Sequence, residues 1–122
     1  MGTVSVRYIV DDVEEAIGFY QDQLGFEVEL HPAPGFASLS RGDLRLLLNV
    51  PGAGGAGTAG DEVPEPGGWN RFQIEVDDLE KFANELRTAG ANFRGEITEG
   101  KGGKQILLRD PSGNVIELFE PP

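Results

Sequence analysis

The chain has 122 residues, a formal net charge of −11 at pH 7 and an isoelectric point of about 4.4. This length suits one domain with a hydrophobic core, and 39% apolar and 25% charged residues are typical of a globular protein. The acidic charge argues against nucleic-acid binding, which needs a basic face. It favours a cationic ligand through long-range attraction, or else it serves solubility alone.

Two further features of the sequence bear on where the protein acts. No apolar run reaches the roughly 18–20 residues of a membrane-spanning helix, and the first residues enter a strand pattern without the regions of a signal peptide. The chain has no cysteine, which excludes disulfides, thiolate nucleophiles and zinc–thiolate sites. We therefore expect a cytoplasmic protein with no membrane partner.

The first half of the chain predicts one strand, one helix and three further strands. Residues 4–10 alternate and are rich in β-branched side chains, which indicates a strand. Asp12 and Glu15 then form the capping box of an amphipathic helix, and Gly25 ends that helix. The remaining strands are expected at residues 26–30, 36–40 and 44–50, with turns at 31–35 and 41–43.

The second half of the chain repeats the first. Residues 51–68 are rich in Gly, Ala and Pro and predict a linker or mobile loop. Beyond it, Val-Asp-Asp-Leu at residues 76–79 echoes Val-Asp-Asp-Val at residues 10–13, and a second helix pattern follows. Strands are expected at residues 71–76, 92–97, 104–109 and 115–119. The sequence thus predicts an α+β protein of two repeated β-α-β-β-β modules, at about residues 3–50 and 69–121, within a single domain spanning 1–122.

Glu117 is the most informative residue in this pattern. It alternates with Val115 and Phe119 on one face of a strand whose other face carries Ile116 and Leu118. A buried carboxylate is costly unless it is paired or bound to a metal. The partner of Glu117 is therefore the main functional question.

Several motifs, found in order and in both modules, resemble the vicinal oxygen chelate superfamily of glyoxalases, bleomycin-resistance proteins and dioxygenases. The resemblance implies a mixed sheet that curls around a cavity, with metal ligands on the first and last strands of each module. When the hairpin glycines Gly42 and Gly113 are aligned, those positions are Ser5, Leu46, Arg71 and Glu117. The motifs are Tyr8-Ile9-Val10-Asp11-Asp12, Phe19-Tyr20, Leu24-Gly25-Phe26, Val76-Asp77-Asp78-Leu79 and residues 110–118.

These four side chains are a poor set of metal ligands. A divalent site needs several nitrogen or oxygen donors, but Leu46 has none and Arg71 is a permanent cation. We therefore expect no metal and no other cofactor, with a divalent metal as the minority alternative. The resemblance also places Arg71 beside Glu117. An ion pair of these two either replaces the metal or only maintains strand register.

The other expected cavity residues are Arg7 and Gln73, which alternation places on the inward faces of their strands, together with Trp69 and Phe119. Trp69 is expected near the cavity mouth, where an indole stacks on a planar ligand, or else it only packs the loop.

Three functions fit these observations. The first is a metal-free protein that binds a drug or metabolite, with a cationic or planar compound as the expected class, similar to bleomycin-resistance proteins. The alternative is a metal-dependent glyoxalase- or dioxygenase-type lyase, isomerase or oxygenase with an atypical site. Glu117 is the one weak catalytic candidate, and a metal-free isomerase or lyase that uses it as a base is a subcase. The third is an accessory domain with a vestigial cavity. We also expect a homodimer, because each module has one helix and so leaves one sheet face uncovered.

Overall fold

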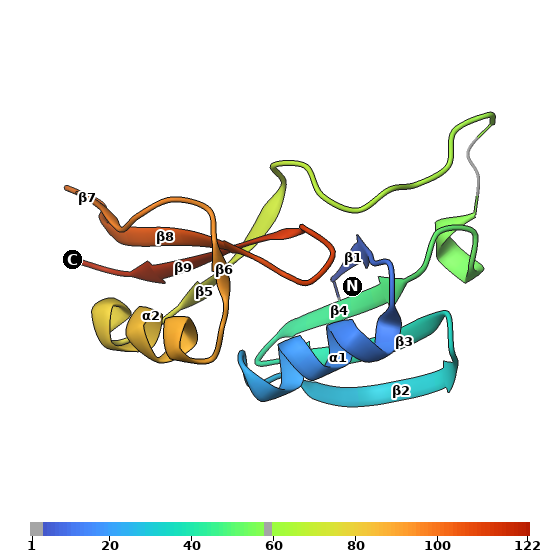
Figure 1. The fold of residues 1–122 in the computed structure, drawn as a ribbon, viewed down its shortest axis with the longest axis horizontal. Helices are drawn as coiled ribbons and strands as arrows, with labels where there is room; N and C mark the ends of the chain where they lie inside the picture. Colours follow the sequence, from blue (N-terminus) through green and yellow to red (C-terminus); the bar gives the residue numbers. More distant parts are fainter. Residues whose placement is uncertain (1–3, 58–59) are drawn as a thin grey trace. The chain divides into compact units, whose positions relative to one another are not determined.

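The computed structural model describes residues 4–57 and 60–122 (Figure 1). Contacts between Cα atoms divide the chain into two compact units, Met1–Gly67 (unit 1) and Gly68–Pro122 (unit 2). Each unit contains one α-helix and one mixed sheet, so the predicted α+β class is confirmed. That the two units form a single domain stays a prediction. In the part of the chain described, neither ten-residue helix has the length and apolar content needed to span a membrane.

Unit 1 follows the predicted β-α-β-β-β order. Its four strands lie in the order β1-β4-β3-β2, with β1 and β4 parallel and the other pairs antiparallel. The helix α1 packs against β2, β3 and β4. The elements are β1 (Ser5–Ile9), α1 (Val13–Asp22), β2 (Glu27–Ala33), β3 (Phe36–Arg41) and β4 (Leu44–Asn49).

Unit 2 repeats this arrangement with one more strand. Four of its strands lie in the order β5-β9-β8-β6, with β5 and β9 parallel. The short strand β7 also pairs with β8, antiparallel. The predicted strand at residues 92–97 begins where expected but is too long: it ends after two residues, because Gly95 has φ +106°, a conformation that breaks a strand. The elements are β5 (Arg71–Glu75), α2 (Leu79–Thr88), β6 (Asn92–Phe93), β7 (Thr98–Gly100), β8 (Gly103–Arg109) and β9 (Val115–Glu120).

The helix α1 begins and ends as the sequence predicts, and α2 follows the same rules. The Asp12 side chain accepts a hydrogen bond from Glu15 N at 3.1 Å, and Asp78 caps α2 in the same way through Lys81 N at 3.1 Å. Just beyond the helices, Gly25 (φ 73°) and Gly90 (φ 88°) adopt the left-handed conformation that ends a helix.

Each helix buries one face of its own sheet, and this sets where a site can form. The buried apolar side chains of unit 2 include Ile74, Ile106, Leu108, Ile116 and Leu118 on the strands and Leu79, Ala83 and Leu86 on α2. Alternation sends Gln73, Gln105, Glu117 and Phe119 to the opposite face, which no helix of the same unit covers. We call this surface the open face of unit 2.

Two predictions about loops are wrong. The predicted turn at residues 31–35 begins too early, since β2 continues to Ala33 and includes His31, whose Nε2 lies 3.4 Å from Glu14 Oε1. The predicted linker also begins too early, because residues 51–56 form a turn and the 3₁₀ helix η1 (Gly54–Ala56), and Ala56 is buried. Residues 58 and 59 of the predicted linker, and residue 3 of the predicted first module, lie outside the part of the chain that the structure describes.

A buried asparagine holds residues 51–56 against unit 1. Asn49 is fully buried, accepts from Arg7 Nε at 3.0 Å through Oδ1 and donates from Nδ2 to the Ala53 carbonyl at 3.1 Å. Arg7 Nη1 also donates to the Gly55 carbonyl at 3.4 Å. Since a buried amide costs free energy unless it is hydrogen-bonded, Asn49 and this loop order each other.

Candidate functional site

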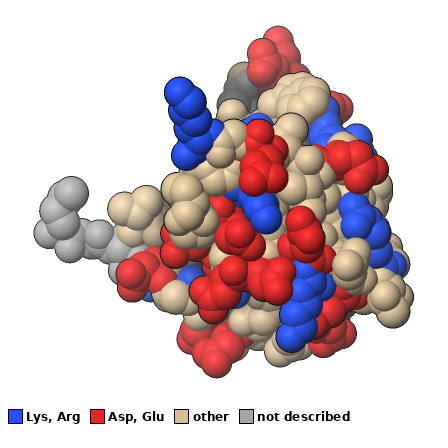
Figure 2. All heavy atoms as spheres, turned by 90° about the vertical axis from the view of Figure 1, so that its left-hand side faces the viewer, with Lys and Arg blue, Asp and Glu red and all other residues tan. Residues whose placement is uncertain are grey.

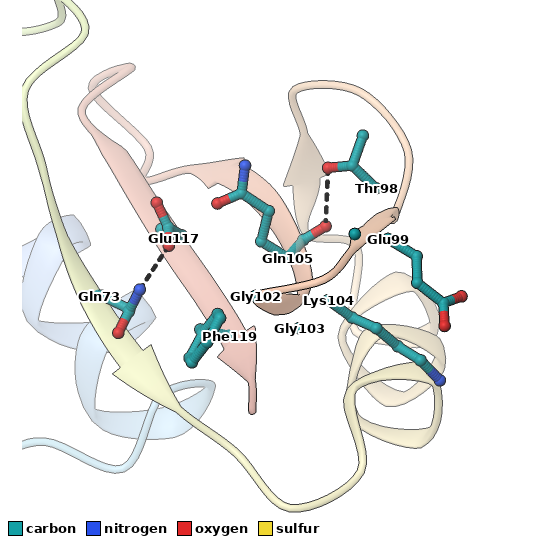
Figure 3. Close-up of a pocket in the computed structure, with 10 residues that line it drawn as sticks. Gln73, Thr98, Glu99, Gly102, Gly103, Lys104, Gln105, Glu117 and Phe119 are labelled. Atoms are coloured by element: carbon teal, nitrogen blue, oxygen red, sulfur yellow. Dashed lines mark hydrogen bonds between the residues drawn. The ribbon is translucent and has the colours of Figure 1, made fainter. Parts of the chain in front are cut away.

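Glu117 lies in the middle of the open face of unit 2 and is 8% exposed. The parallel pairing of β5 and β9 places Gln73 directly opposite it, and Gln73 Nε2 donates to Glu117 Oε2 at 2.6 Å (Figure 3). Arg71, two residues earlier on β5, donates from Nε to Glu117 Oε1 at 2.9 Å. The predicted contact between Arg71 and Glu117 is therefore confirmed, and Gln73 is a third member of the cluster.

A fourth side chain completes the environment of the carboxylate. With its amide nitrogen facing Glu117, Gln105 on β8 donates to Glu117 Oε2 at 3.0 Å and to Oε1 at 3.1 Å. The nitrogen of an amide is assigned from such a network, and here only this orientation pairs donors with acceptors. Both oxygens of Glu117 then accept hydrogen bonds from protein donors. The cost of burying this charge is offset by Arg71 and two amides.

A pocket of about 440 Å³ opens beside this cluster. In Figure 3, Gln73 and Phe119 border it from β5 and β9, and Gln105 from β8. Glu99 and Lys104 point outward, away from Glu117. The pocket thus combines one aromatic ring, two amides and a neutralised carboxylate. It is lined by Gln73, Thr98, Glu99, Gly100, Gly102, Gly103, Lys104, Gln105, Glu117 and Phe119.

Gly103 allows the backbone at the start of β8 to pack closely against Phe119 and Glu120 at the edge of this pocket. Its φ is +123°, and a Cβ at this position would meet the Glu120 carbonyl oxygen and come within 3.0–3.1 Å of the Phe119 ring. Only glycine combines this backbone conformation with such a close approach. The start of β8 can therefore lie directly against Phe119.

The sheet register corrects one of the four expected metal positions. Gln73 pairs with Glu117 in unit 2, and the matching β1 residue, Arg7, pairs with Leu47. The counterpart of Glu117 is therefore Leu47, and the choice of Leu46, which is fully buried, was wrong. The physical reason is loop length: the β3–β4 hairpin closes from Arg41 to Leu44, whereas the β8–β9 hairpin closes from Arg109 to Val115.

The corrected set, Ser5, Leu47, Arg71 and Glu117, does not fit a divalent metal. Leu47 has no donor atom, Arg71 is a cation, and the oxygens of Glu117 already accept from other side chains. Within residues 4–57 and 60–122, no group of three or more His, Cys, Asp or Glu residues is arranged to hold a metal ion. A site of this chemistry lacks the ligand number that such ions require.

The remaining predicted site residues lie elsewhere. Arg7 belongs to unit 1, where Asn49 and Gly55 bind its guanidinium group. Trp69 is 64% exposed and does not line the pocket; the Arg94 guanidinium carbon lies 3.2 Å from its ring centroid, and Arg94 Nη1 donates to the Gly68 carbonyl at 2.9 Å. Arg71 contacts Glu117 without lining the pocket. Of the predicted residues, Gln73, Glu117 and Phe119 border the pocket.

Sequence reasoning missed Gln105 and the glycine-rich segment at residues 100–103. The available signal was Gln105 itself, a polar residue that begins an otherwise apolar run and alternates with Ile106. Its distance from Glu117 depends on the β8–β9 register, which places Gln105 opposite Phe119. The sequence also did not indicate a second pocket of about 630 Å³ in unit 1, which Leu30, Phe36 and Leu47 help to line.

The surface charge agrees with the composition. On the face shown in Figure 2, Asp and Glu side chains spread across the surface and Lys and Arg lie among them. This face has no continuous basic patch of the kind that binds nucleic acid.

Comparison with known proteins gives a consistent result. The model of the Glyoxalase/Bleomycin resistance protein/Dioxygenase superfamily matches residues 2–118. A bleomycin resistance protein from Geobacillus stearothermophilus is 25% identical over 120 residues, which cover 91% of this chain and 90% of that protein.

Two solved structures share the fold. Lactoylglutathione lyase from Agrobacterium tumefaciens has a TM-score of 0.76 at 22% identity, over 98% of this chain and 92% of that one. The bleomycin-binding protein from Streptomyces verticillus, solved with copper(II)-bleomycin, has a TM-score of 0.65 at 22% identity, over 100% and 98%.

Proposed function

The chain belongs to the Glyoxalase/Bleomycin resistance protein/Dioxygenase superfamily, and from this premise we propose that it is a metal-free protein that binds a small drug or metabolite. The predicted resemblance is confirmed by the family match. The binding function, the absence of a metal and the class of ligand are proposals.

The observation that carries the proposal is the state of Glu117. It is the only carboxylate among the four expected ligand positions, and Arg71, Gln73 and Gln105 donate to its two oxygens. A metal ion would have to displace these donors and approach a guanidinium group, with few other ligands to compensate. The cluster is better suited to a rigid polar wall for an organic ligand.

Two further observations support a small-molecule ligand. The pocket of about 440 Å³ falls in the roughly 300–1,000 Å³ range of small-molecule sites, and Phe119 offers a ring against which a planar group can pack. The relative from Geobacillus stearothermophilus is named a bleomycin resistance protein, and the neighbour from Streptomyces verticillus was solved with bleomycin bound. The net charge of −11 favours a ligand that carries positive charge overall.

Metal analysis is the first test of this function. We expect the purified protein to contain far less than one equivalent of divalent metal, and titration calorimetry with nickel, zinc, manganese or iron(II) to show no tight stoichiometric binding. Stoichiometric tight binding would overturn the proposal and favour the metal-dependent enzyme. Cooperative unfolding of the same sample, measured in parallel, shows that the protein is folded when no metal binding is detected.

The same protein should then be screened by calorimetry against planar natural products. For any compound that binds, we expect Phe119→Ala to weaken binding about tenfold, the loss of one aromatic contact. Trp69→Phe is the matched control and should leave affinity unchanged, because Trp69 lies outside the pocket lining. No binding across a broad panel by folded protein would favour the accessory-domain alternative.

We also infer that the protein is a homodimer. The open face of unit 2 has no helix of its own unit against it, and unit 1 likewise has one helix for one sheet. Burying such faces against a second copy would remove apolar surface, such as Leu30 and Val28 on β2, from water. Sedimentation velocity at micromolar concentration should give a dimer, and a monomer would contradict this inference.

A further inference from the structure

The guanidinium group of Arg71 binds Glu117 through its Nε atom alone. Its Nε donates to Glu117 Oε1 at 2.9 Å, and no other hydrogen bond or ion pair of the Arg71 side chain is found within residues 4–57 and 60–122. An arginine–carboxylate pair commonly forms two parallel bonds, with each carboxylate oxygen accepting one. Here the pair makes a single bond.

The reason for the single bond is competition for the second oxygen. Glu117 Oε2 accepts from Gln73 at 2.6 Å, and from Gln105 at 3.0 Å. The two Nη atoms of Arg71, which carry four N–H donors, are left free of partners in this part of the chain. The Arg71 side chain is 31% exposed, so these donors are reachable from solvent.

The strand register places a second arginine at the same end of the open face. Arg71 on β5 and Arg109 on β8 both pair with Val115 on β9, so the three residues form a row across the sheet. Two interstrand spacings separate the arginine Cα atoms, about 9.5 Å. Arg109 Nη1 donates at 3.4 Å to Asn92 Oδ1 and to the Phe93 carbonyl, both on β6, so its guanidinium group is directed away from β9 and from Arg71.

Arg71 is the arginine of this row whose guanidinium group lies beside Glu117. Glu117, in the next row, is the nearest carboxylate by register, and Arg71 already neutralises it. Glu75 pairs with Phe119 one row further on, at the pocket end of the face. Asp110 follows Arg109 in the chain, so the two arginines and the two carboxylates at this end of the sheet balance in charge. The free edge of Arg71 therefore offers directed N–H donors and no surplus positive charge.

We propose that the free Nη edge of Arg71 binds a carboxylate group of the ligand. This inference rests on the proposed binding function. It assigns a recognition group, the Arg71 guanidinium, that does not line the pocket. A planar guanidinium edge matches the two oxygens of a carboxylate, and the bond to Glu117 holds that edge in place before the ligand arrives. The guanidinium group of Arg71 contacts Glu117, which lies two residues from Phe119 along β9, about 7 Å, so one ligand can reach both the subsite and the ring.

Two isosteric probes of opposite charge test the proposal by NMR. Benzoate and benzamidinium have the same planar shape, and each is titrated into ¹⁵N-labelled full-length protein while the Arg71 Nε–H signal is followed. We expect benzoate to shift the Arg71 signal. We also expect its affinity to be about tenfold weaker in Arg71→Lys, which keeps the positive charge but loses the planar pair of N–H donors. Arg87→Lys on α2 is the matched control and should bind benzoate as the parent does.

The outcomes separate this inference from the proposed function. Shifts caused by benzamidinium instead of benzoate, no shift of Arg71 with either probe, or unchanged benzoate affinity in Arg71→Lys would each overturn the carboxylate subsite. In those cases the binding function still stands if compounds from the screen bind and their affinity depends on Phe119. Failure of that screen, in contrast, removes the function on which the subsite rests.

Discussion

Arg71→Met is expected to lower the free energy of unfolding by about 2–3 kcal/mol, since it leaves the Glu117 carboxylate buried without its cation. The estimate lies below the range for fully buried pairs because the Arg71 side chain is 31% exposed. Urea unfolding followed by circular dichroism measures the change. Arg87→Met is the control: its pair with Glu96, at 3.4 Å, is exposed on both sides, and we expect a loss of under about 1 kcal/mol.

The double variant Arg71→Met/Glu117→Leu separates the two interpretations of the pair. Replacing both charges by apolar groups removes the unpaired carboxylate, so stability should return to within about 1 kcal/mol of the parent. If it does, and benzoate binding is lost, the pair serves ligand recognition. A double variant less stable than either single variant would show instead that the pair maintains strand register. A single variant as stable as the parent would contradict the burial argument itself.

Gly103→Ala is expected to lower the free energy of unfolding by about 3 kcal/mol. The new methyl group would meet the Glu120 carbonyl oxygen and the Phe119 ring, and φ of +123° is strained for any residue with a Cβ. Because the nearest atom belongs to the backbone of β9, a side-chain rotation cannot relieve the clash. Thermal unfolding with calorimetric detection provides the measurement.

The neighbouring glycine supplies a matched control for this substitution. A Cβ on Gly102 meets nothing within 4 Å, so Gly102→Ala should change stability by less than about 0.5 kcal/mol. Equal stability of the two variants would show that β8 can move away from Phe119. In that case the edge of the pocket would be adjustable, and the rigid wall proposed for ligand binding would be wrong.

Local rules within the sequence were sufficient for much of this protein. The duplicated Val-Asp-Asp pattern predicted two modules, and both expected helices begin at an aspartate cap and end near a glycine. The contact of Arg71 with Glu117 was also predictable, because strand alternation puts both side chains on one face once their strands are neighbours.

Tertiary structure decided the features that depend on pairing between distant segments. Leu47 replaces Leu46 as the counterpart of Glu117 because the two hairpins differ in length, and a one-residue slip reverses the face of a strand residue. Residues 51–56 are ordered through Asn49 and Arg7, the latter more than 40 positions away in the chain. Gln105 reaches Glu117 only through the β8–β9 register. Composition and periodicity describe each segment with its near neighbours, whereas these contacts are set by how strands come together across the sheet.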